Sequence, residues 1–221
     1  MMKKILLWVF GVPVLGLQGI FLLSLMESRE VTVELPKPHY QPKPTDPAWL
    51  AQMVQFHGHL GPWAVAGVRF GVAGREAVGA QGYFDLQVRC QGPLDRPPRA
   101  CFLDGLQVGS GATLGKRNIH WEPAEELVVW VKNTRTGQTA ELRPTGFFWE
   151  FLTAAKTKSK PSGASEAEEA KDHTHPQGPP APSSKQQEVE ESLEQIARQI
   201  AMLPQAKILT VKILPPPKNP D

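Results

Sequence analysis

A long apolar stretch near the N-terminus constrains this 221-residue chain more than any other feature. The stretch runs from Ile5 to Met26, and Gln18 and Ser24 are the strongly polar residues within it. Its 22 residues match the length of an apolar helix that spans a bilayer, about 20 residues. We therefore expect residues 1–30 to form one N-terminal transmembrane helix.

Charges on either side of this stretch predict its orientation. Lys3 and Lys4 precede it, whereas Glu27 and Glu30 follow it. Positive residues stay on the cytoplasmic side, so the rest of the chain is expected outside, in the periplasm of a bacterium. The chain would then be a single-pass membrane protein with an extracytoplasmic C-terminal domain. The alternative is a cleaved signal peptide, for which residues 23–27 offer a poor cleavage site.

Composition divides the remainder into four parts. Residues 31–46 carry four prolines and predict an extended spacer. Residues 47–155 read as the main domain, and residues 156–183, rich in Pro, Ser, Lys, Glu and Gly, as a disordered linker. A helix and a strand in residues 184–214 are too short to stand alone, so we expect them to return to the main domain.

The hydrophobic pattern of the main domain mixes helices and strands. Helices are predicted over 47–55, with Asp46 as its N-terminal cap, and over 63–79, 101–109 and 145–155. Strands are predicted over 83–90, 117–121, 126–133, 138–143 and 207–214, with Asn133–Gly137 as the hairpin turn before 138–143. Gly67, Gly71 and Gly74 fall on one face of the second helix. They indicate close packing against another backbone, with close approach of a ligand as the alternative.

His57 and His59 flank a glycine just before a predicted helix start. The dipole of that helix favours neutral imidazole, the form that binds metal or acts as a base. A capping or packing role for both histidines is the alternative.

A second group of polar residues lies on the predicted helix 101–109. Cys101, Asp104 and Gln107 are three apart and share one face. A thiolate, a carboxylate and two imidazoles make a plausible ligand set for zinc. The alternatives are a buried Cys101 or a disulfide to Cys90, and for Asp104 a hydrogen bond to nearby backbone.

The glycine-rich stretch from Ser110 to Lys116 resembles a phosphate-binding loop only superficially. Ser110 replaces the first glycine of that motif, and Arg117 stands where Ser or Thr is required. The stretch could still form a nest of amides, with Lys116 as the charge partner of an anion. His120, on a predicted strand, and His173 and His175, in the linker, carry no further signal.

Taken together, three blocks resemble the signature of the FmdE-like family of formylmethanofuran dehydrogenase proteins. They are Phe56–Pro62, Cys101–Gln107 and Gly111–Ile119, in the family's order and spacing. The resemblance covers residues 48–155 and is expected to extend to the last helix and strand. It implies an α+β domain, often dimeric, with an antiparallel sheet packed with helices. It also implies a cleft that binds a metal where the His, Cys and Asp/Gln blocks meet.

The chain departs from this family at several points. Many relatives carry cysteines where Gly61 and Ala112 stand, so a cysteine-rich site is impossible here. Some relatives add a zinc ribbon with paired CxxC motifs, and this chain has two cysteines in all. A membrane anchor is foreign to part of a cytoplasmic enzyme. The resemblance therefore does not predict formylmethanofuran chemistry.

These observations predict an accessory or binding protein that holds a divalent metal ion, such as zinc, or a metal-containing small molecule. The expected metal ligands are His57, His59 and Cys101. Asp104 and Gln107 are expected to orient those ligands.

Two further predictions concern ligands and catalysis. The polar or anionic part of the ligand is expected to contact Thr113 and Lys116, together with Asp104 and Gln107. The alternative function is a thiol- or metal-dependent enzyme that uses Cys101 with His57 or His59 as the base; its candidate catalytic residues are Cys101, His57 and Asp104. A structural module with a vestigial cleft is a third interpretation. The near balance of 24 basic and 22 acidic residues predicts no nucleic-acid partner.

Overall fold

The computed structural model describes residues 33–158 and 184–215. The predicted membrane helix and most of the predicted linker lie outside these residues. Within them, no helix is both long enough and apolar enough to cross a membrane. Contacts divide the chain into residues 1–36 and a compact unit from Lys37 to Asp221, and that second unit carries the fold.

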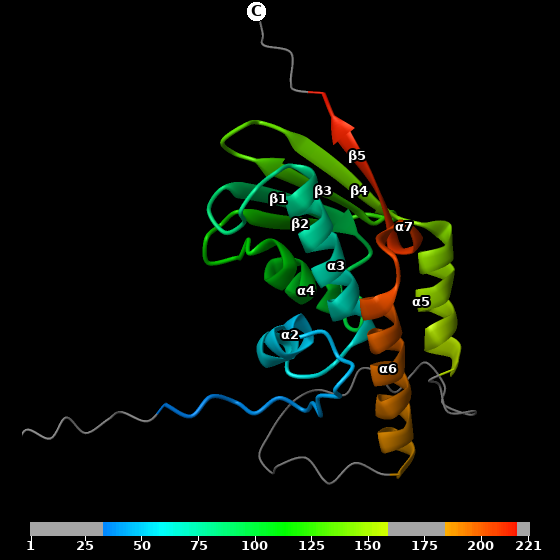
Figure 1. The fold of residues 1–221 in the computed structure, drawn as a ribbon. Coiled ribbons are helices and arrows are strands. Elements are labelled where there is room, and N and C mark those ends of the chain that lie inside the picture. The colour runs from blue at the N-terminus through cyan, green and yellow to red at the C-terminus, as the bar shows by residue number, and fades with distance from the viewer. Residues whose placement is uncertain (1–32, 159–183, 216–221) are drawn as a thin grey trace, which may run out of the picture. The chain divides into compact units, whose positions relative to one another are not determined.

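One five-stranded sheet organises this unit (Figure 1). Its strands are β1 (Leu86–Gly92), β2 (Ile119–Pro123), β3 (Val128–Asn133), β4 (Thr139–Pro144) and β5 (Leu209–Leu214), in the order β2-β1-β3-β4-β5. The β1–β2 pair is parallel, whereas the other three pairs are antiparallel. The α+β class is thus confirmed, but the sheet is mixed rather than antiparallel. A helix connects β1 to β2, and such a crossover returns the chain in the same direction.

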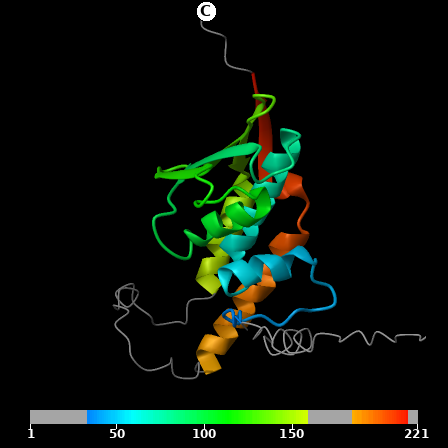
Figure 2. The ribbon, with the colours of Figure 1, turned by 90° about the vertical axis from the view of Figure 1, so that its left-hand side faces the viewer.

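Six helices accompany the sheet in the described residues. They are α2 (Trp49–His57), α3 (Pro62–Ala77), α4 (Cys101–Ser110), α5 (Gly146–Lys158), α6 (Ser184–Met202) and the short α7 (Gln205–Ile208). Figure 2 shows α3 and α4 lying together beside the sheet. The sequence pattern did not predict α7, which has only four residues.

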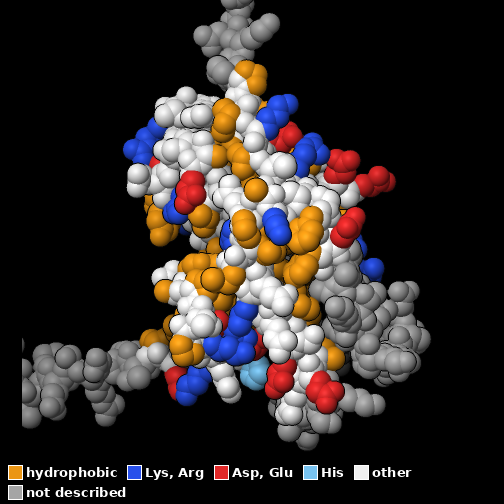
Figure 3. All heavy atoms as spheres, turned by 45° about the vertical axis from the view of Figure 1, so that its right-hand side comes forward, with side chains coloured by type: hydrophobic (Ala, Val, Ile, Leu, Met, Phe, Trp, Pro, Cys, Tyr) orange, Lys and Arg blue, Asp and Glu red, His pale blue; other side chains and the backbone are white. Residues whose placement is uncertain are grey.

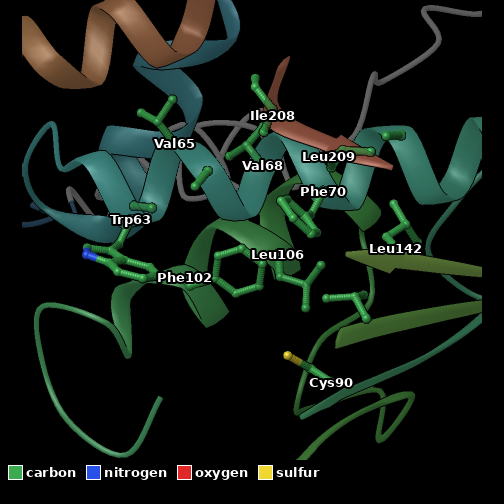
Figure 4. Packing of buried hydrophobic residues seen from close by; sticks show 14 of the residues in the cluster. Trp63, Val65, Val68, Phe70, Cys90, Phe102, Leu106, Leu142, Ile208 and Leu209 are labelled. Carbon is green, nitrogen blue, oxygen red and sulfur yellow. The ribbon is translucent and has the colours of Figure 1, made fainter. Parts of the chain in front are cut away.

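The core lies between the sheet and α3 with α4 (Figure 4). Alternate residues of β1, namely Leu86, Val88 and Cys90, are buried, as period-two alternation requires. From the helices, Phe70 meets Phe102 edge-on with ring centroids 5.2 Å apart. This packing holds α3 and α4 in place relative to each other. It therefore also sets the positions of the residues before and within their first turns.

Glycines let α3 and α4 approach backbone to backbone. A Cβ at Gly67 would lie 2.0 Å from the carbonyl oxygen of Phe102, and one at Gly105 would lie 1.8 Å from that of Ala64. Neither position has room for a side chain, so the predicted close packing is confirmed for α3. Gly74 differs, because it faces side chains of β3 and β4 instead of a helix backbone.

The C-terminal helix and strand pack on the same unit. Strand β5 pairs with β4 along its whole length, and α6 packs against α3. Nη1 of Arg69 on α3 donates hydrogen bonds to the carbonyls of Ile200 and Ala201, at 3.1 and 2.8 Å. These carbonyls lie in the last turn of α6, where helical partners are missing, so Arg69 caps that helix.

One local prediction was wrong because a distant residue decided the outcome. Asp46 was expected to cap a helix that begins at Pro47, but α2 begins at Trp49 without a side-chain cap. Asp46 instead pairs with Arg198, 152 residues away. This pair ties the start of the domain to α6.

The surface shown in Figure 3 mixes acidic, basic and small hydrophobic groups. No basic stripe crosses the described residues on that face. This distribution agrees with the balanced composition of the chain.

Candidate functional site

The blocks Phe56–Pro62 and Cys101–Gln107 meet because α3 and α4 run in the same direction. Gly67 of α3 lies against residues 102–106, and Gly71, one turn later, lies against residues 106–110. The contacts advance together along both helices, so both helices begin at the same end of the unit. That end receives the His57–His59 loop before α3 and the first turn of α4, which carries Cys101 and Asp104.

His57 is the centre of this cluster. It is the last residue of α2, and Gly58 then adopts a left-handed conformation with φ of 98°, which turns the chain toward α3. The His57 side chain is 6% exposed, and its Nδ1 donates a 2.7 Å hydrogen bond to Oδ2 of Asp104. The carboxylate therefore fixes the orientation of the ring and leaves Nε2 as its second functional atom.

Nε2 of His57 is buried and has no hydrogen-bond partner among the described residues. Buried polar atoms are normally paired, so an orphan of this kind requires an explanation. The ring of His59 lies beside it, with centroids 4.5 Å apart. A Cβ at Gly61 would be 3.7 Å from Nε2 of His57 and 3.1 Å from Nε2 of His59. The Nε2 atoms of both rings thus lie beside Gly61, where a side chain would crowd them.

The two imidazoles differ in basicity. The hydrogen bond to Asp104, with the nearby thiol of Cys101, raises the pKa of His57 to about 9 despite burial. Desolvation and the neighbouring His57 lower the pKa of His59, although His59 as a residue is exposed. The neutral form expected for both histidines is therefore favoured for His59 only. A proton on Nε2 of His57 would be buried without an acceptor, and an unprotonated Nε2 would be buried without a donor. A bound group would supply the missing partner in either protonation state.

The two cysteines have different surroundings. Both are free, so the alternative of a disulfide is wrong. Cys90 is fully buried on β1, and burial raises the pKa of its thiol to about 12, which makes it unreactive. Cys101 is partly exposed at the first position of α4, near His57. Of the two, Cys101 is therefore the one placed for chemistry.

A metal ion fits this cluster in part. The orphan Nε2 atom, a second Nε2 beside it, and a carboxylate on Nδ1 of His57 match the way proteins arrange histidine ligands. However, no three His, Cys, Asp or Glu side chains of the described residues are arranged to hold one ion together. The residues present fit a metal through two imidazole nitrogens, with Cys101 nearby but not aligned as a third ligand.

The remaining predicted ligand residues do not gather at this cluster. Thr113 and Lys116 follow the C-terminal end of α4, and a helix of ten residues is about 15 Å long. Gln107 lies between the two ends of α4, and its Oε1 accepts a 3.2 Å hydrogen bond from the amide of Leu114. The set predicted to contact one ligand is therefore divided between two places.

The glycine-rich stretch is closed by its own side chains. Oδ1 of Asn118 accepts from the amide of Thr113 at 3.0 Å, and Oγ1 of Thr113 accepts from the amide of Lys116 at 3.3 Å. Lys116 extends its ammonium group over the rings of Tyr83 and Phe84, 5.8 and 5.7 Å from their centroids. These amides are already bonded, so the predicted amide nest for an anion does not form here.

Sequence reasoning missed the structural role of Asn118 and the position of Gly61 beside the two imidazoles. Asn118 also donates to the carbonyls of Tyr83 and Leu86, at 2.5 and 3.1 Å, and so ties the stretch to β1. Its place in the third family block was the available signal. His120 is exposed on β2, and His173 and His175 lie outside the described residues.

Comparison with known families agrees with this architecture. The family model described as FmdE, Molybdenum formylmethanofuran dehydrogenase operon, matches residues 56–210. The match begins at the His-Gly-His loop, contains α4 and its following stretch, and extends through α6 into β5. Comparison with curated proteins gave no match. Since the family model covers more than half of the 221 residues, this chain belongs to the FmdE family.

Proposed function

We propose that this domain binds a divalent metal ion, or a small molecule that contains one, at the Nε2 atoms of His57 and His59. The observation that carries the proposal is the buried Nε2 of His57, which has no hydrogen-bond partner in the described residues. A metal ion at this atom would use the lone pair of the neutral ring. Asp104 would hold the ring and increase its basicity from the other side.

Two imidazoles leave most coordination positions open. Zinc in proteins takes four ligands, and three protein ligands with one open position are usual at catalytic sites. An ion at His57 and His59 would therefore bring water or its own ligands, or would gain the Cys101 thiol by a side-chain movement. This favours a binding or accessory role, in which a metal or metal-containing molecule is received and released.

We further propose that the domain is carried outside the cytoplasm on the N-terminal segment. The basis is the apolar run from Ile5 to Met26 with lysines before it and glutamates after it. A homodimer is proposed on the family resemblance. Both proposals concern where and with what the domain acts, and neither alters the chemistry of the histidine pair.

Titration of the purified, metal-free full chain with Zn²⁺ tests the metal proposal. We expect one bound ion per chain, and with Co²⁺ the absorption bands of a coordinated ion. His59→Gln should weaken binding at least tenfold, since it removes one of two protein ligands. His120→Gln, which changes an exposed histidine on β2, should leave binding unchanged. Absence of stoichiometric metal, or equal binding by both variants, would reject the proposal.

A thiol enzyme is the second candidate. The favouring observation is that Asp104 orients His57 while Cys101 lies near the same ring. The thiol of Cys101 contributes to the raised pKa of His57, yet Nε2 of His57 has no hydrogen-bond partner in the described part of the chain. Iodoacetamide labelling decides: an activated Cys101 reacts faster than a free thiol at pH 7 and loses this advantage in His57→Gln. Slow labelling excludes this function.

A further inference from the structure

The segment that leads into the domain lies directly against the histidine loop. The amide of His39 donates a 2.7 Å hydrogen bond to the carbonyl of Gly58. His39 also pairs with His59 as a single parallel bridge. Gly58 stands between His57 and His59, so this contact acts on the backbone that sets where both rings point.

Arg198 of α6 holds the same segment. Its Nε donates to both carboxylate oxygens of Asp46, at 2.9 and 3.2 Å, and its Nη2 donates to the carbonyl of Gln41 at 3.0 Å. Its Nη1 donates to Glu194 at 2.8 Å, while the hydroxyl of Tyr40 donates to Asp46 at 2.8 Å. The Arg198 and Asp46 side chains are only 13% and 5% exposed. A buried pair with every nitrogen of the guanidinium bonded fixes one geometry.

Helix α6 faces the histidine loop as well as the segment. Glu190 lies 3.8 Å from Nδ1 of His39, and Glu190 and Glu194 both act electrostatically on His59. The loop is thus enclosed by α4 on one side, and by residues 37–46 backed by α6 on another. Residues 37–46 were predicted to be part of an extended spacer, and they instead form one wall of the histidine cluster.

We propose that residues 37–46 form a clasp that positions His57 and His59, so that docking of this segment and metal binding at the two rings reinforce each other. The proposal rests on the proposed metal binding. A loop held in its binding geometry loses less conformational freedom when an ion arrives, so the closed clasp raises affinity. By linkage, the bound ion must stabilise the closed clasp by the same factor.

A matched pair of substitutions at His39 isolates the clasp contact. His39→Pro removes the amide that donates to Gly58, whereas His39→Ala keeps that amide and removes the imidazole. In the full chain, we expect the Pro variant to bind Zn²⁺ about tenfold more weakly and the Ala variant to bind within about twofold of wild type. Equal affinities in all three proteins would overturn the clasp. An Ala variant as weak as the Pro variant would overturn it too, because the imidazole would then be the cause.

A second pair tests the other end of the clasp. Arg198→Met should weaken Zn²⁺ binding as His39→Pro does. Arg143→Met is its control, because Arg143 also bonds two carboxylates, Glu126 and Glu141, but on β4. If both arginine variants bind Zn²⁺ as wild type does, the link to α6 is refuted.

The effect of bound Zn²⁺ on the clasp shows whether the clasp and the metal site are coupled or whether the clasp only stabilises the fold. Zn²⁺ should slow hydrogen exchange at the His39 amide about tenfold by NMR, and should do so less in Arg198→Met. An unchanged exchange rate in the presence of bound Zn²⁺ overturns the proposal. Should the wild-type chain bind no Zn²⁺, the metal proposal fails by itself. The clasp is then judged by the imidazole resonances of His57 and His59, which must shift in His39→Pro but not in His39→Ala.

Discussion

Polar side chains gather at both ends of α4, but the two groups differ in how completely they are bonded. At the C-terminal end, Gln107, Thr113 and Asn118 bond the amides of the glycine-rich stretch. At the N-terminal end, His57 keeps a buried nitrogen without a partner in the described residues, and Nε2 of His59 lies with it beside Gly61. Both ends looked like ligand sites in the sequence.

This difference in hydrogen bonding separates residues that stabilise the fold from residues that can bind a ligand. A closed hydrogen-bond network stabilises the fold and leaves a ligand nothing to bond. An unpaired buried atom costs free energy, and proteins retain such atoms where a ligand or ion completes them. We therefore assign the N-terminal end of α4 to binding and the C-terminal end to stability, and four predictions test this division.

The largest effect is expected where the backbones of α3 and α4 touch, because this contact, here called the seam, holds both ends of α4 in place. Gly105→Ala would put a Cβ 1.8 Å from the carbonyl oxygen of Ala64, which belongs to the backbone and cannot move alone. We expect the free energy of unfolding to fall by about 3 kcal/mol or more, and both ends to be lost together. Gly115→Ala is the control, since its Cβ would meet nothing closer than Oγ1 of Thr113 at 4.0 Å. Urea denaturation measures both, and equal stabilities would contradict the seam.

Asn118→Ala should break the C-terminal end alone. It removes the hydrogen bonds to the amide of Thr113 and to the carbonyls of Tyr83 and Leu86. We expect unfolding free energy to fall by about 1–3 kcal/mol, because these groups lose their partners. Zn²⁺ affinity should stay within about twofold of wild type. A loss of Zn²⁺ binding as large as that of His59→Gln would show that the two ends are not separate.

Gly61→Cys should sharpen the N-terminal end. Its Cβ would lie 3.1 Å from Nε2 of His59, so small shifts of the ring would admit it, and φ of −109° at Gly61 suits any residue. The added thiolate supplies a third ligand, and we expect Zn²⁺ to bind at least tenfold more tightly. With Co²⁺, a sulfur charge-transfer band should appear. Gly61→Ala supplies the Cβ without the sulfur, and Cys binding no tighter than Ala would count against the site.

Acid should produce the smallest effect, at the turn beside the C-terminal end. The amide of Gln81, the guanidinium of Arg135 and the amide of Gly82 lower the pKa of Asp85 below its ordinary 3.8, against the effect of burial. The folded-state pKa is thus below the unfolded one, so the contribution of Asp85 is present above pH 3.8 and lost as pH falls through the lowered value. Urea midpoints from pH 5 to 2 should decline less in Asp85→Asn than in wild type. Parallel declines would contradict this role.

Local signals predicted most of the elements. The Asn133–Gly137 turn marked the β3–β4 hairpin, and Gly67 with Gly71 marked the seam of α3. The family blocks placed His57 near Asp104, which the 2.7 Å hydrogen bond confirms. The hairpin and the glycine face were predictable because each depends on turn chemistry or periodicity within a short stretch, whereas the His57–Asp104 pair was predictable only from the family blocks.

The errors depend on distant partners. Asp46 looked like a helix cap, but Arg198 offered a stronger bond from far along the chain. The glycine-rich stretch looked like an open nest, but Asn118 bonds the amide of Thr113 and is itself held by the distant carbonyls of Tyr83 and Leu86. The parallel pairing of β1 with β2 follows from the packing of α4, the helix that connects them. The residues of the two strands do not predict this packing. Where a polar side chain can bond either a neighbour in the sequence or a residue far along the chain, the local sequence does not show which partner it takes.

The shared starting end of α3 and α4 also has an electrical consequence. Each helix places about half a positive charge at its N-terminus, and here two such ends point toward one cluster. Within these two described helices, the acidic side chain of the first turns is Asp104 alone, and His57 already engages it. The two ends together amount to about one positive charge, which the carboxylate of Asp104 offsets, while Glu190 and Glu194 add negative charge beside His59. The helix starts therefore set the His57–Asp104 side of the cluster apart from the more acidic His59 side.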